Sequence, residues 1–306
     1  MKALGACLVG ARLLDEETAA GFGAAAAEDA LAAALMNVAR PNGALAGLVG
    51  QVAGLAAVLR DRLTNEVHHT LTTGLRALRE QSRQLPSARD RRRGLEALAN
   101  AMGEVRGFCA AVAGLAAENM GRGGGRLVLD LGRRIERGQA IASELSLLLG
   151  QRGIETHPAL LEPVLRLALE LRDSVITYRA RYLGVLQPAP VLDLVLADEG
   201  NPRGLAFQLA AARDLLAGLA GEHGADRVFG DAAAAMLAEV QAMVADVVAS
   251  AAQARSACEQ APRLKALAGA MGTLSNDVAR RYFALLPAVR SFGVEGSAAP
   301  ELRGAA

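Results

Sequence analysis

Alanine and leucine dominate this chain, and aromatic side chains are almost missing from it. Its 306 residues include six Phe, three Tyr and no Trp, although 52% of them are hydrophobic. The strands of a sandwich or barrel draw on aromatic and β-branched residues, whereas Ala and Leu are strong helix formers. The composition therefore predicts an all-α protein, a multi-helix bundle of long antiparallel helices that pack closely through Ala and Gly.

Charge and cysteine usage argue against several classes of function. The 33 basic and 32 acidic residues leave a net charge of +1, which gives no positive field for a nucleic-acid backbone. The three cysteines lie far apart without a Cys-x-x-Cys pair, and the four histidines show no metal-ligand spacing. We therefore expect no nucleic-acid partner, no disulfide framework, and no metal or cofactor bound by this chain itself.

Neither a signal peptide nor a membrane span is expected. The longest weakly charged run, 41–59, is interrupted by Asn42, Gln51 and several glycines. A span needs about 20 predominantly apolar residues. The N-terminus reaches Arg12 and Asp15 too soon for a signal peptide. We expect a cytoplasmic protein without a membrane partner.

Turn and capping residues divide the chain into helices. Pro41-Asn42-Gly43 is a turn, Thr64 is a candidate N-cap, and Ser87 can cap the helix that follows it. We expect helices at about 44–85 with a break near Thr64, 87–120, 125–150, 158–186, 202–219, 231–260 and 262–286. A short helix, or alternatively a strand, is expected at 191–196. We assign 1–292 to one domain and 293–306 to a frayed C-terminal tail.

The helix after the Gly-rich loop carries a charged face. At 100° per residue, Asp130, Arg133, Arg134 and Arg137 share an arc of about 100°, separate from the apolar side of the helix. Asp130 is spaced to pair with Arg134. Three guanidinium groups beside one carboxylate leave donors that suit a carboxylate or phosphate ligand. A solvated charged face is the alternative interpretation.

The Gly-rich loop itself, 121–125, precedes the N-terminus of that helix. Free backbone N–H groups and the helix dipole favour an anion at such a position. The loop lacks the Gly-Lys-Ser/Thr sequence of a P-loop, so as a nucleotide signature it is weak. A flexible connection is the alternative.

A second polar group lies on the next helix. Ser174, Thr177, Tyr178 and Arg181 share an arc of a helix that is otherwise rich in Leu, Val and Ile. Buried polar groups need partners, so we expect this seam to meet another polar segment. A structural seam and a ligand site both fit the pattern.

The expected partner is Asp193 together with the acidic turn at 198–203, which contains Asp198, Glu199, Asn201 and Arg203. Asn201 is expected to cap the following helix, with Pro202 at its first position. The adjacent Asp198 and Glu199 suit Mg²⁺ with substrate phosphates, or pairs with neighbouring arginines. No Ser-His-Asp or Cys-His nucleophile has a supporting local signature.

Four stretches of this sequence share their pattern with one protein family. They are Glu118-Asn119-Met120 with Arg122 and 130–137; 177–182 with 186–194; 198–203 with 206–209; and Arg281-Tyr282-Phe283. These stretches resemble the signatures of the alpha-E domain family, densely over 118–209 and loosely over 45–290.

The resemblance implies an all-helical domain that occurs alone or fused behind a circularly permuted ATP-grasp domain. It implies a component of an ATP-grasp-linked system that forms peptide or amide bonds, as in peptide tagging. ATP and Mg²⁺ would be handled by the ATP-grasp partner, and this chain would bind an acidic or peptide substrate without a catalytic motif of its own. A helical scaffold or protein-interaction module with a purely structural charged network is the alternative.

The sequence departs from the family pattern at its start. The family's first helix usually carries Gly-Arg-Tyr-x-Glu-Arg, which is missing here, and Arg126 stands where a Trp is usual. The missing helix implies the C-terminal part of a longer protein or a divergent copy.

The candidate functional face combines the polar residues of these segments. It comprises Glu118, Asn119, Arg122, Asp130, Arg133, Arg134, Glu136, Arg137, Tyr178, Arg179, Arg181, Tyr182, Asp193, Asp198, Glu199, Asn201, Arg203 and Gln208. Asp198 and Glu199 would bind an amine or a metal. A carboxylate or phosphate would be bound by Arg133, Arg134, Arg137, Arg179 and Arg181. The resemblance assigns no catalytic role to any of them.

Overall fold

The computed structural model describes residues 2–10, 14, 16–17, 27–85, 91–151, 153–155, 158–182, 184–223 and 227–283. Within these ranges the chain is all-α and contains no strand, which confirms the fold class expected from composition. The elements are α1 (Lys2–Gly10), α3 (Ala27–Ala39), α4 (Ala44–Val58), the 3-10 helix η2 (Arg60–Arg62), α5 (Asn65–Gln84), α6 (Arg91–Asn119), α7 (Gly124–Leu149), α8 (Pro158–Leu171), α9 (Val175–Tyr182), α10 (Pro188–Leu192), the π-helix η3 (Asp193–Ala197), α11 (Leu205–His223), α12 (Val228–Ala249), α13 (Gln253–Glu259) and α14 (Ala261–Phe283).

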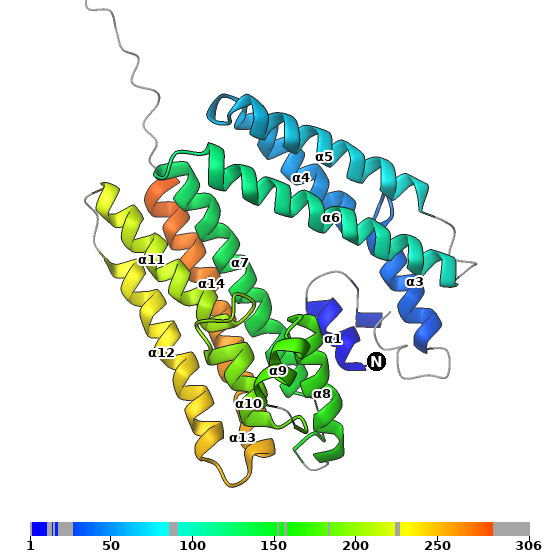
Figure 1. Ribbon diagram of the computed structural model, residues 1–306, viewed down its shortest axis with the longest axis vertical. Coiled ribbons are helices and arrows are strands. Elements are labelled where there is room, and N and C mark those ends of the chain that lie inside the picture. The colour runs from blue at the N-terminus through cyan, green and yellow to red at the C-terminus, as the bar shows by residue number, and fades with distance from the viewer. Residues whose placement is uncertain are drawn as a thin grey trace, which may run out of the picture.

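The main body is built around α7. This helix packs most extensively against α14 and α11, and α12 covers the far side of α11 (Figure 1). The apolar stripe of α7 recurs at helical spacing and is buried at Leu131, Ile135, Ala142, Leu145 and Leu149, as the sequence predicts. The short helices α8, α9, α10 and α13 lie at one end of this body, and α1 packs on α7.

The N-terminal helices α3 to α6 form a separate layer with a smaller core. Val49, Leu75 and Leu78 pack together there, and Val105 and Phe108 of α6 cover them. This core does not merge with the main one among the described residues. The assignment of 1–292 to one domain stays a prediction, and the tail at 293–306 lies outside the described residues.

Two segments are long and apolar enough to cross a bilayer by length and composition alone, Leu31–Val58 and Val228–Ala249. The first is interrupted between α3 and α4 by the Pro41-Asn42-Gly43 turn. The second is α12, which places Val240 and Met243 in the main core. Core helices of soluble proteins pass the same test, so the location of this protein stays a prediction.

Several helix ends lie where the sequence places them. The Thr64 hydroxyl accepts a hydrogen bond from the Val67 N–H at 3.3 Å and caps α5. The Gly-rich loop ends at Gly124, whose φ of +33° is a conformation that only glycine adopts readily. The expected cap Ser87 lies outside the described residues.

The single helix expected over 158–186 is wrong, because the chain turns at Asp173. This residue has a φ of +45°, and the Ser174 N–H returns to the Leu169 carbonyl at 2.9 Å. A left-handed residue with that hydrogen bond is the Schellman motif that ends many helices, and Asp tolerates this conformation better than most residues. The polar pair Asp173-Ser174 therefore closes α8 and opens α9.

Three further expectations are corrected. The helix expected from 191 begins at Pro188, in keeping with the preference of proline for a first helical position, and the strand alternative is wrong. The helix expected from 202 begins at Leu205. The helix expected over 231–260 is interrupted after Ala249, where the Ser250 hydroxyl accepts a hydrogen bond from the Ala252 N–H.

The packing of α1 on α7 makes a testable difference between the cysteines. Burial raises the pKa of the Cys7 thiol to about 11, whereas Cys109 is exposed on α6. Only about one Cys7 in 1000 is then a thiolate at pH 8, and the thiolate is the reactive form. We expect iodoacetamide at pH 8 to alkylate Cys109 at least a hundredfold faster than Cys7, as followed by peptide mass spectrometry. Equal rates would show that α1 does not pack on α7.

Candidate functional site

Asp130 pairs with two arginines on the charged face of α7. Asp130 accepts from Arg133 Nη1 at 3.0 Å through Oδ1, and it contacts Arg126 Nε at 3.5 Å through Oδ2. Arg126 also donates to the Ala117 carbonyl at 2.5 Å, which ties α7 to the last turn of α6. The expected pair between Asp130 and Arg134 is wrong, because Arg134 turns toward α11 instead.

Arg134 packs against α11 inside the fold. Its guanidinium carbon lies 5.1 Å from the centre of the Phe207 ring, a distance typical of cation–π contact. Burial lowers the pKa of Arg134, and the nearby charges of Arg133 and Arg137 lower it further. Three guanidinium groups therefore stand close together on α7.

Gln208 connects this face to the acidic turn. The side chain is fully buried in α11, where its Oε1 accepts from Arg134 Nη1 at 3.2 Å. Its Nε2 donates to the Pro202 carbonyl at 2.6 Å. Both ends of this amide are thus satisfied within the protein, so Gln208 has a structural task.

The two tyrosines of α9 also have their partners inside the fold. Tyr178 is buried; its hydroxyl donates to the Val185 carbonyl and accepts from the Gln187 N–H, both at 3.3 Å. Its ring centre lies 5.0 Å from that of Tyr182. The Tyr182 hydroxyl donates to Asp193 Oδ2 at 3.1 Å, and burial together with this carboxylate raises the pKa of Tyr182. This pair fixes α9 against the segment that leads into η3.

Asn201 lies at the centre of the polar seam. Its Nδ2 donates to the Leu194 carbonyl at 2.9 Å and contacts Ser174 Oγ at 3.4 Å, while its Oδ1 accepts from the Arg203 N–H at 3.1 Å. Asn201 was expected to cap a helix; it joins η3, α9 and the acidic turn instead. On the surface beside it, Arg203 pairs with Asp173 at 2.5 Å.

The acids of the turn form pairs with neighbouring side chains. Asp198 accepts from Arg181 Nη1 at 2.5 Å, and this bond raises the pKa of Arg181. Glu199 accepts from Gln241 Nε2 of α12 at 3.1 Å. Asp198 thus forms the ion pair that the sequence left open as one alternative, whereas Glu199 is bound by an uncharged glutamine. The described part of the chain contains no group of three or more acids, histidines or cysteines arranged for a metal.

The N-terminus of α7 holds an anion from the chain itself. Glu222, at the end of α11, accepts from the Gly124 N–H at 2.9 Å through Oε2. A carboxylate at a helix N-terminus is favoured by the free N–H groups and the dipole. The sequence indicated an anion at this position, but nothing in it pointed to an acid 98 residues away as the source.

The start of the candidate face lies apart from this network. Asn119 donates to Glu66 of α5 at 2.5 Å and so joins the ends of two helices of the N-terminal layer. Glu118 and Arg122 are exposed, and neither has a hydrogen bond or ion pair to any described residue. The structure therefore does not bring these three residues into the polar seam.

The other charged residues of the candidate face on the main body are exposed. Glu136 and Arg137 of α7 and Arg179 of α9 are exposed and form no ion pair with another described residue. The candidate face thus divides into an internal network, centred on Asn201 and Gln208, and exposed charges that the fold does not use.

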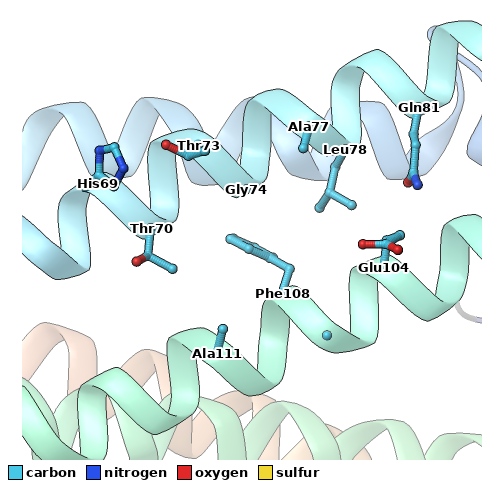
Figure 2. Close-up of a pocket in the computed structure, with 11 residues that line it drawn as sticks. His69, Thr70, Thr73, Gly74, Ala77, Leu78, Gln81, Glu104, Phe108 and Ala111 are labelled. Carbon is cyan, nitrogen blue, oxygen red and sulfur yellow. The ribbon is translucent and has the colours of Figure 1, made fainter.

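The cavity described here lies elsewhere. It has a volume of about 420 Å³, is lined by α5 and α6, and includes none of the candidate residues (Figure 2). None of its lining residues was expected to form a site, because His69 is one of the four histidines without metal-ligand spacing and the others belong to no motif.

Comparison with known proteins gives one family and several distant relatives. The model of the Alpha-E family, described as a predicted alpha-helical domain with a conserved ER motif, matches residues 6–283. Uncharacterized protein Rv2567 of Mycobacterium tuberculosis and Uncharacterized protein Mb2597 of Mycobacterium bovis are each 32% identical over 183 residues. The match covers 59% of this chain but only 20% of each relative, so it spans a fifth of their length. No solved structure matches the chain.

Proposed function

The chain belongs to the Alpha-E family, and from that premise we propose that it is the substrate-binding component of an ATP-grasp-linked system that forms peptide or amide bonds. Its role is to hold a carboxylate of an acidic or peptide substrate on Arg137, the exposed arginine of α7, beside the half-buried Arg133. ATP and Mg²⁺ are handled by a circularly permuted ATP-grasp partner. The reaction itself takes place on that partner.

The observation that carries this proposal is the unused charge at Glu136-Arg137. This is the one Glu-Arg pair in the sequence, and it lies in the stretch 130–137, which carries part of the resemblance to the family. Neither side chain is used by the fold within the described residues, and Arg137 stands beside Arg133 and Arg134. A planar guanidinium group donates two parallel hydrogen bonds to a carboxylate, so a cluster of three with one paired acid favours an anionic ligand.

The internal network favours a second function for the rest of the face. Tyr178, Asn201 and Gln208 are buried with their hydrogen bonds satisfied, and Arg181 is paired with Asp198. Groups paired in this way stabilise the packing of helices. The alternative is therefore a helical scaffold, in which this seam only shapes a docking surface for the ATP-grasp partner.

Replacing Arg137 by alanine separates the two functions. We expect Arg137→Ala to weaken binding of a short peptide with a free C-terminal carboxylate at least tenfold, because hydrogen bonds to charged groups contribute about 1.5–3 kcal/mol. Arg137→Lys keeps the positive charge but lacks the two parallel donors of the guanidinium group, so it should retain part of the affinity. Calorimetry of the peptide, with and without the ATP-grasp partner and ATP, measures this effect.

The matched control is Arg106→Ala, which removes an exposed arginine from α6. It should leave peptide affinity within twofold of the unchanged protein. If the unchanged chain binds the partner but no peptide in either setting, substrate binding is wrong and the scaffold function stands. If Arg137→Ala binds peptide as well as the unchanged protein, the assignment to this arginine is wrong.

A further inference from the structure

The cavity between α5 and α6 presents acceptors and an aromatic ring, but no fixed positive charge. Its polar lining comes from His69, Thr70, Thr73 and Gln81 of α5 and from Glu104 of α6, and Phe108 of α6 reaches between the two helices (Figure 2). No lysine or arginine is among the described residues that line it. A volume of about 420 Å³ lies within the range of small-molecule sites.

Gln81 brings an unpaired polar atom to this lining. Its Oε1 is buried, and it is the one buried side-chain nitrogen or oxygen among the described residues that has no hydrogen-bond partner. Buried polar atoms are nearly always hydrogen-bonded, because an unpaired one has lost its water without replacement. The side chain points from α5 toward α6, on the side of Glu104 (Figure 2). A donor placed in the cavity would satisfy this oxygen.

The neighbours of Gln81 restrict the chemistry of that donor. Glu104 forms no ion pair with a described residue, so its carboxylate is available to a cation. The ring of Phe108 offers a π face, which attracts ammonium groups. Leu78 and Ala77 supply an apolar wall beside these groups.

Gly74 makes room for the ring of Phe108. A Cβ atom at position 74 would lie 2.3 Å from Phe108 Cδ2, so the ring packs directly against the backbone of α5. This contact holds the ring between the helices.

We infer that the cavity between α5 and α6 binds a small primary amine, with its ammonium group at Glu104 and Gln81 and its apolar stem against Leu78 and Phe108. An ammonium group has three donors and one positive charge, which match one carboxylate, one amide oxygen and a π face. An alcohol of the same length lacks the charge, and a carboxylate of the same length is repelled by Glu104. The site shares no residue with the arginines of α7.

The test uses n-pentylammonium, 1-pentanol and pentanoate as probes in phosphate buffer at low salt. The chain has six Phe, so the signal of Phe108 in a Phe-labelled sample can be assigned with Phe108→Leu and followed by NMR during titration. We expect n-pentylammonium to shift this signal saturably, with a Kd at least tenfold below that of 1-pentanol, and pentanoate to leave it unchanged.

Variants of the acceptors decide whether the preference comes from this site. Glu104→Gln should reduce the preference for the amine over the alcohol to about twofold or less. The matched control Glu96→Gln removes an exposed acid of the same helix and should keep the full preference. Gln81→Leu should weaken n-pentylammonium about tenfold and raise Tm, because the unpaired oxygen is removed; a variant that merely damaged the fold would lower Tm.

Three results would overturn the inference. One is equal affinity for n-pentylammonium and 1-pentanol, and another is tighter binding of pentanoate. The third is a tenfold amine preference that survives Glu104→Gln.

Discussion

Replacing Asn201 by alanine is expected to lower the free energy of unfolding by about 3 kcal/mol. The substitution removes the donor to the Leu194 carbonyl and the acceptor for the Arg203 N–H, and Leu194 is fully buried. A buried polar group without a partner costs the full penalty of its lost hydration. Denaturant unfolding followed by circular dichroism measures the change.

Two further variants make this result specific. Asn201→Asp keeps the size of the side chain but cannot donate to the Leu194 carbonyl when ionised, so it should be at least as destabilising as Asn201→Ala. Asn276→Ala removes an exposed asparagine from α14 and should change stability by less than about 0.5 kcal/mol. A loss below about 1 kcal/mol for Asn201→Ala would show that this residue does not join η3, α9 and the acidic turn.

Gly138→Val is expected to destabilise the protein by about 3 kcal/mol, because Gly138 lies where α7 meets α14. A Cβ atom at this position would lie 2.3 Å from Cε and 3.2 Å from Sδ of Met271. Met271 is fully buried, so the end of its side chain can shift only against packed neighbours. The valine methyl groups would force α7 and α14 apart.

Gly132 of the same helix is the matched control. A Cβ atom there would meet nothing within 4 Å, so Gly132→Ala should stabilise the protein by up to about 1 kcal/mol through helix propensity alone. The double variant Gly138→Val with Met271→Ala should lose less stability than the sum of its single changes, since the two side chains compete for one space. Additive losses would mean that they do not touch.

The spacing of apolar residues predicted the long helices of the main body, but not the points where a helix is interrupted. The apolar stripe of α7 follows from spacing alone, because residues three and four apart share a helix face. The turn at Asp173 could not be predicted from spacing. Its left-handed backbone conformation depends on tertiary contacts, among them the ion pair with Arg203. Asp173-Ser174 is a capping sequence, but the hydrophobic pattern continues on both sides of it and predicted one unbroken helix.

The sequence indicated part of the polar network, but it did not predict which residues pair with one another. The sequence indicated that Tyr178 and its neighbours would meet Asp193 and the acidic turn. Tyr182 does bind Asp193, and Ser174 does contact Asn201. The partner of Arg134 was predicted wrongly, because spacing along a helix cannot show that a buried glutamine on α11 competes for the same guanidinium. The cavity had no sequence signal at all, since Gln81 and Glu104 come together only when α5 and α6 dock.

The place of α14 in the main body has a consequence for synthesis on the ribosome. The apolar stripe of α7 is complete at Leu149, but its largest covering surface begins only at Ala261. At typical elongation rates the part of this stripe that α14 covers stays open for on the order of ten seconds. During that interval the side of α7 that packs on α14 is an exposed apolar surface, and a chain truncated before α14 would keep it exposed.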